Sequence, residues 1–169
     1  MKFISDIRLL LTGLWLGAAV FFIGVAQSAF AVLPAREMAG AMVSRTLMIL
    51  NVSGLIIGLI LLATSFIKRQ GFNTAQVWVE RILIFVMTVA CAVGQFVVAL
   101  WLNFVRAEMG RPIDEVAADD PLRIQFNNLH EYSVWVLFAG MIAAILLFFL
   151  IAGKNFAAAR QTNISAADF

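Results

Sequence analysis

Residues 132–153 read YSVWVLFAGMIAAILLFFLIAG, a stretch of 22 residues without a charged side chain. An α-helix rises about 1.5 Å per residue, and about 20 apolar residues cross the hydrocarbon core of a bilayer. Three more uncharged stretches precede it, at residues 9–35, 46–67 and 82–105, with 27, 22 and 24 residues. The pattern predicts four transmembrane helices.

The composition supports this interpretation. Of the 169 residues, 63% are hydrophobic and 13% are charged, whereas a soluble domain is about 45–50% apolar and about 25% charged. The pattern excludes a soluble globular protein, a disordered chain and a nucleic-acid-binding domain. The first apolar stretch is too long for a signal peptide, so we expect a retained span. We expect residues 1–169 to form a single transmembrane domain without a separate soluble domain.

Start and stop signals give the expected helix ends. Pro34 separates the first two helices, and Gly71 favours the end of the second. Asn73 is placed to cap the third helix, and Asp120-Pro121 supplies a capping aspartate followed by a proline at the first helical position. We therefore predict an all-α integral membrane four-helix bundle, with helices at about residues 7–33, 36–69, 74–108 and 121–153.

Loop charges predict the orientation. Four spans place both termini and the second loop on one side of the membrane. That side carries seven basic residues, and the opposite side carries five. Because loops rich in Lys and Arg stay in the cytoplasm, we expect a multi-pass protein of the bacterial inner (plasma) membrane with both termini cytoplasmic. The basic residues on the side of the termini are Lys2, Arg8, Lys68, Arg69, Arg81, Lys154 and Arg160.

Small residues recur at helical spacing in three of the predicted spans. In a membrane, close packing and polar contacts hold helices together, and small residues allow backbones to approach. We expect these residues to pack within the bundle; the alternative is a seam between two copies of the chain. They are Gly13, Gly17 and Gly24, then Gly54 and Gly58, then Ala90 and Gly94.

The sequence contains no recognisable catalytic motif, such as a nucleophile elbow, a His-Glu-x-x-His helix or a phosphate-binding loop. We therefore expect a protein that is not an enzyme. In addition, no predicted span has an acidic or basic residue near its centre. Because proton-coupled transporters keep an ionisable group within the membrane, this absence disfavours that class.

Uncharged polar residues and one arginine gather in the half of the bilayer away from the termini. We expect them to form hydrogen bonds between helices, each worth about 1 kcal/mol or less. The alternative is a shallow polar pocket that opens on the side away from the termini. These residues are Gln27, Asn51, Gln95, Asn103, Arg106 and Asn127.

His130 is the single histidine of the chain. A neutral imidazole can ligate haem, a chlorin or a metal. A bis-histidine haem would need a second chain, and one histidine by itself does not make a closed metal site, which needs several more ligands. We predict no metal site and no bound cofactor, and we retain haem or chlorin ligation by His130 as the alternative.

The segment from Asp120 to Ser133 contains Phe126-x-x-Leu129-His130-x-x-Ser133 at the opening of the last span. This pattern resembles the transmembrane-protein-205-like family (domain of unknown function 4149). Residues 17–22, which read GAAVFF, and Ala39-Gly40 before Arg45 are similar to other features of that family. The resemblance implies a small four-span membrane protein without an assigned reaction.

Three functional hypotheses follow. The first is a non-enzymatic accessory or structural subunit that packs against a larger membrane complex. The second is a small oligomeric transporter or channel, with its polar pocket in the non-cytoplasmic half of the bilayer. The third is a haem- or pigment-binding membrane protein that uses His130. The expected partners are the lipid bilayer and other membrane-protein subunits or a second copy of the chain, not nucleic acid.

Overall fold

The computed structural model describes residues 2–67 and 74–167, and these are helical over most of their length. The residues fold into long helices joined by short connections, as the uncharged stretches predict. The elements are α1 (Lys2–Val32), α2 (Arg36–Ser65), α3 (Thr74–Val93), the π-helical segment η1 (Gly94–Val98), α4 (Ala99–Met109), the 3₁₀ turn η2 (Ile113–Glu115) and α5 (Pro121–Ala167).

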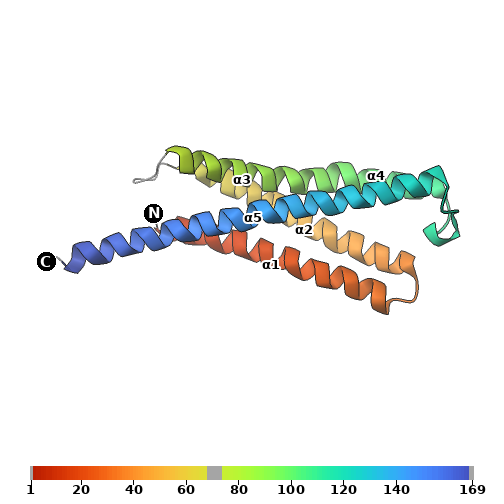
Figure 1. Cartoon of the computed structure of the whole chain (residues 1–169), viewed down its shortest axis with the longest axis horizontal. Helices are drawn as coiled ribbons and strands as arrows, with labels where there is room; N and C mark the ends of the chain where they lie inside the picture. Colours follow the sequence, from red (N-terminus) through yellow and green to blue (C-terminus); the bar gives the residue numbers. More distant parts are fainter. Residues whose placement is uncertain (1, 68–73, 168–169) are drawn as a thin grey trace.

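The segments α3, η1 and α4 follow one another without a break and form one helical rod. With this rod counted once, the described residues contain four helices long and apolar enough to cross a membrane. The rods run antiparallel, with both termini at one end of the bundle and the connections α1–α2 and α4–α5 at the other (Figure 1). We call these ends the termini side and the loop side. The protein is therefore an all-α bundle of four apolar helices, consistent with a multi-pass membrane protein.

Two predicted helix ends are confirmed in atomic detail. Asp120 Oδ1 accepts a hydrogen bond of 2.8 Å from the backbone N–H of Leu122, so the aspartate caps α5 as its position before Pro121 predicts. At the end of α4, Gly110 adopts the left-handed conformation with φ of 61°. Glycine takes this conformation without the steric cost that a side chain adds, so the helix stops there.

Other ends differ from the sequence prediction. α1 begins at Lys2 instead of residue 7, and α5 continues to Ala167 instead of residue 153 because no proline or other stop signal interrupts its alanine-rich end. α2 ends at Ser65, four residues before the predicted end. The carbonyl of Ser65, at this helix end, accepts a hydrogen bond of 3.2 Å from Arg81 Nη2. The predicted stop at Gly71 and cap at Asn73 lie outside the described residues.

Three clusters of apolar side chains fill the bundle. The central cluster includes Trp15, Phe22 and Leu50, and a second cluster on the termini side includes Leu61 and Leu147. Both draw on α1, α2, α3 and α5, either through buried residues or through neighbours packed against them. The third cluster lies on the loop side and is formed by α4, the following connection and α5 alone: Val105, Met109, Val116 and Leu129, with Leu102, Leu122 and Phe126 against them.

Glycines bring the central helices close together. A Cβ atom at Gly54 would stand 2.6 Å from Cys91 Sγ and 2.8 Å from Trp15 Cε2, and one at Gly58 would stand 3.0 Å from Thr88 Cβ. Such distances leave no room for a methyl group. These glycines therefore pack within the bundle, as the first interpretation of their spacing predicts.

Candidate functional site

The predicted polar residues divide between the interior and the surface of the bundle. Asn51 is buried, and its Nδ2 atom lies 3.1 Å from where a Cβ of Gly94 would be. Gln95 follows Gly94 directly, and its Oε1 atom is buried without a hydrogen-bond partner among residues 2–67 and 74–167. The structure thus brings Asn51 and the Gly94-Gln95 pair together in the interior.

The remaining members of the predicted set lie elsewhere. Gln27, Asn103, Asn127 and His130 are exposed on the outer surface of the bundle. Arg106 is half-buried, with its guanidinium carbon 5.5 Å from the centre of the Phe126 ring and Nη2 3.4 Å from where a Cβ of Gly40 would be. The set therefore does not converge on one pocket.

The interior amides coincide with a backbone irregularity that we did not predict. Gly94–Val98 form a π-helical segment within the rod that continues from α3 into α4. Single π turns inside α-helices are rare and frequently lie at functional sites. Small and polar residues at 94 and 95 are a sequence signal for such a site, although their spacing does not specify a π turn.

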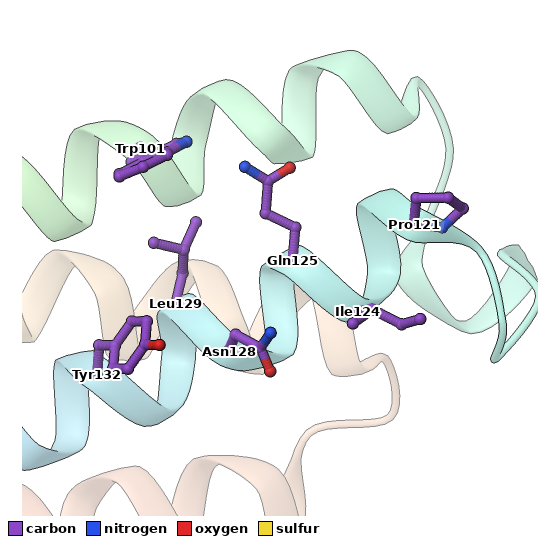
Figure 2. A pocket seen from close by; sticks show the side chains of 7 residues that line it. All are labelled: Trp101, Pro121, Ile124, Gln125, Asn128, Leu129 and Tyr132. Carbon is purple, nitrogen blue, oxygen red and sulfur yellow. The ribbon is translucent and has the colours of Figure 1, made fainter.

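A groove of about 460 Å³ runs between α4 and α5 on the loop side. Figure 2 shows the Gln125 amide directed toward α4, beside Leu129 and opposite Trp101. The groove lies on the outer surface, because Trp101, Ile124 and Tyr132 are about half exposed or more. Its lining residues are Trp101, Pro121, Ile124, Gln125, Asn128, Leu129 and Tyr132. No pattern in the sequence predicts this groove.

A group of buried charges lies inside the bundle on the termini side. Glu80 of α3 bridges two cations: its Oε1 lies 2.5 Å from Arg8 Nη2 of α1, and its Oε2 lies 2.7 Å from Lys154 Nζ of α5. The side chains of Arg8, Glu80 and Lys154 are only 1%, 5% and 12% exposed. We call these three residues the charged clasp.

A second polar connection lies beside the clasp. Ser5 Oγ donates to Asn155 Oδ1 at 2.6 Å, and Asn155 Nδ2 donates to Asp6 Oδ1 at 3.0 Å. These hydrogen bonds tie α1 to α5 at the level where Glu80 ties both helices to α3. The termini side of the bundle is therefore held together by buried charge and by side-chain hydrogen bonds.

Arg8 and Lys154 belong to the basic residues that the sequence places on the termini side, and their burial is not predicted. A signal for the clasp is nevertheless present. Arg8 directly precedes the first uncharged stretch, Glu80 lies two residues before the third, and Lys154 directly follows the fourth. In an antiparallel bundle these positions share one level, so charges of opposite sign there can meet.

Comparison with known proteins identifies the family. No curated protein and no solved structure matches the chain. One family model matches residues 10–111, which extend from α1 to the end of α4 and make up more than half of the chain. The pattern from Phe126 to Ser133 lies outside the matched segment, whereas residues 17–22 and Ala39-Gly40 lie inside it. The chain belongs to the family described as domain of unknown function (DUF4149).

Proposed function

We propose that this protein is a non-enzymatic accessory subunit that packs against another membrane protein through the outer face of α1. The observation that supports this proposal is a pair of glycines on that face. A Cβ at Gly17 or at Gly24 would have no described atom within 4 Å. By contrast, Cβ atoms at Gly13, Gly54, Gly58, Gly94 and Gly140 would all meet side chains within 3.2 Å.

The two glycines are seven residues apart and therefore lie on one face of α1. Glycine inside a helix costs about 0.5–1 kcal/mol relative to alanine. In this bundle no neighbour among the described residues uses the space that Gly17 and Gly24 leave. A helix of a partner protein could use it, since small residues in a membrane allow two helix backbones to approach closely.

Polar side chains on the same face support a protein partner rather than lipid. Gln27 and Ser28 are exposed and have no hydrogen bond from their side chains to the described part of the chain. Gln27 lies five residues from the middle of the first uncharged stretch, which is about 8 Å along the helix and inside a hydrocarbon half-layer of about 15 Å. An amide at that depth gains from a polar partner that lipid tails do not offer.

The two other hypotheses receive less support from the geometry. The Trp15 indole fills the centre of the bundle, where it contacts the positions of Gly54 and Gly140. A transport pathway would therefore need an oligomer that forms a path between chains. His130 is exposed on α5, so a haem or chlorin bound there would lie on the outside of the bundle. We accordingly propose a protein without a bound cofactor.

We further propose that both termini face the cytoplasm and that the protein resides in a bacterial inner membrane, on the basis of the basic residues on the termini side. We also infer kinship with transmembrane-protein-205-like proteins. This inference is based on the pattern from Phe126 to Ser133, together with residues 17–22 and Ala39-Gly40.

Purification in mild detergent tests the proposal. The tagged wild-type chain should co-purify with a membrane protein in a fixed ratio, and the variant Gly17→Leu/Gly24→Leu should lose it while remaining folded. Ala139→Leu is the matched control, because Ala139 is a small exposed residue of α5. A wild-type chain that purifies without any partner, or a double variant that keeps its partner, would refute the proposal.

A further inference from the structure

The loop side of the bundle consists of two helix pairs that do not share an apolar core. The cluster around Val105 and Leu129 contains residues of α4, of α5 and of the connection between them, and none of α1 or α2. α4 packs mainly on α5 and η1. In Figure 1 the α1–α2 pair diverges from the α4–α5 pair toward this end. On the loop side the two pairs have no common apolar cluster, and Arg106 of α4 reaches α2, with Nη2 3.4 Å from where a Cβ of Gly40 would be.

The connection between α4 and α5, residues 110–120, acts as a strap that reaches from one pair to the other. Its Val116 is buried in the cluster of the α4–α5 pair, and Arg123 donates a hydrogen bond to the Val116 carbonyl. On its other side, Asp114 Oδ1 lies 3.2 Å from Arg36 Nη1 at the start of α2. The strap is thus fixed to α4 and α5 and touches α2 through a charge pair.

The charge pair between the strap and α2 is exposed to solvent. The side chains of Arg36 and Asp114 are 68% and 50% exposed. Ion pairs in such positions contribute little to stability and are screened by salt. The ion pair between the strap and α2 is therefore weak, in contrast to the buried charged clasp at the termini side.

A backbone element suited to a hinge lies between α3 and α4. The π segment Gly94–Val98 separates α3, which packs on α2 and α5, from α4, which packs on α5. π turns are among the recognised causes of helix bending. The buried Gln95 Oε1, which lacks a partner in the described part of the chain, lies in this segment.

We propose that the loop side opens and closes: the α1–α2 pair moves away from the α4–α5 pair, with the charged clasp as the fixed end and the π segment as the hinge. The pair Arg36–Asp114 holds the strap in the closed position. Opening gives solvent or a partner on the loop side access to Asn51 and Gln95. This motion goes beyond the proposed docking role of α1 and does not depend on it.

Distances between pairs of spin labels in the full chain, reconstituted in a bilayer, test this motion. One pair, Glu37→Cys with Glu115→Cys, spans from α2 to the strap, and both residues are exposed. A control pair, Ala107→Cys with Ile124→Cys, lies within the α4–α5 unit and is also exposed. Cys91 is buried, and the wild-type chain labelled in parallel gives its background.

The substitution Asp114→Asn should increase the ratio of open to closed chains by about 1.5- to 5-fold, which is the range expected for loss of an exposed ion pair. The 37–115 distances then gain a longer component, and the 107–124 distances stay unchanged. Exchanging the charges, with Arg36→Asp and Asp114→Arg, should restore the original distances. Unchanged 37–115 distances in Asp114→Asn would overturn the proposal. A change in both label pairs would also overturn it, because it would mean that the α4–α5 unit itself rearranges instead of moving as one body.

Discussion

The substitution Glu80→Gln removes one negative charge from the charged clasp and nearly preserves the shape of the side chain. In the wild-type chain the two Glu80 oxygens lie 2.5 Å from Arg8 Nη2 and 2.7 Å from Lys154 Nζ. The variant leaves two cations near each other in a site from which water is largely excluded. We expect the free energy of unfolding to fall by about 3–5 kcal/mol, the usual cost of removing one partner of a buried ion pair.

The structure also predicts how the single variants rank by their loss of unfolding free energy. Arg8→Met leaves Glu80 with Lys154, and Lys154→Met leaves it with Arg8, so each should cost less than Glu80→Gln. Lys154→Met should lower the free energy of unfolding least, because the Lys154 side chain is 12% exposed and Arg8 is 1% exposed. A long side chain near the surface can move its charge toward water, so its ion pair contributes less to stability than the pair of a fully buried cation.

Unfolding in mixed micelles of a mild detergent and sodium dodecyl sulfate, followed by tryptophan fluorescence, provides the measurement. Asp114→Asn is the matched control, since it removes the same kind of charge from an exposed pair. The triple variant Arg8→Met/Glu80→Met/Lys154→Met should regain most of the lost stability, because apolar replacement of a whole buried network is often neutral. The reasoning is wrong if Glu80→Gln and Asp114→Asn unfold alike. It is also wrong if the triple variant is as unstable as Glu80→Gln.

Two further predictions concern packing and capping. Gly54→Ala should lower the free energy of unfolding by about 1–3 kcal/mol, because its Cβ would stand 2.6 Å from Cys91 Sγ. Gly17→Ala should not lower the free energy of unfolding, because a Cβ at Gly17 would have no described atom within 4 Å. Equal losses for the two variants in the same micelle assay would contradict the close packing described around Gly54. Asp120→Ala should destabilise the start of α5 by about 1 kcal/mol, because the 2.8 Å hydrogen bond from the Leu122 amide is lost. Hydrogen exchange at that amide should then accelerate, and an unchanged rate would argue against the cap.

Much of the fold is predictable because membrane helices are determined by local composition. The four uncharged stretches all lie within long helices, and Asp120-Pro121 caps α5 as its position in the sequence predicts. The extension of α5 to Ala167 is harder to predict. A span prediction ends where apolar residues end, whereas a helix continues until its backbone meets a stop signal.

The candidate sites are less predictable than the fold. The sequence places Gln27, Asn51 and Gln95 in the same half of the bilayer, but depth alone does not give the direction of a side chain around its helix. In the structure, Asn51 faces the interior near the π segment and Gln27 faces outward. Because π turns are rare and lack a specific sequence pattern, η1 and the hinge proposed there depend on the three-dimensional packing.

The class of the protein, the number of its long apolar helices and the grouping of its loops on two sides can be derived from the amino-acid sequence alone. These properties are sums over neighbouring residues, and the free energy of placing a helix in lipid depends on such sums. Which side chains contact one another depends on the three-dimensional packing of the helices. Arg8, Glu80 and Lys154 are far apart in the chain and, counted singly, are loop charges. They form a buried clasp because antiparallel packing places these parts of α1, α3 and α5 at one level, where the Glu80 carboxylate lies between the two cations.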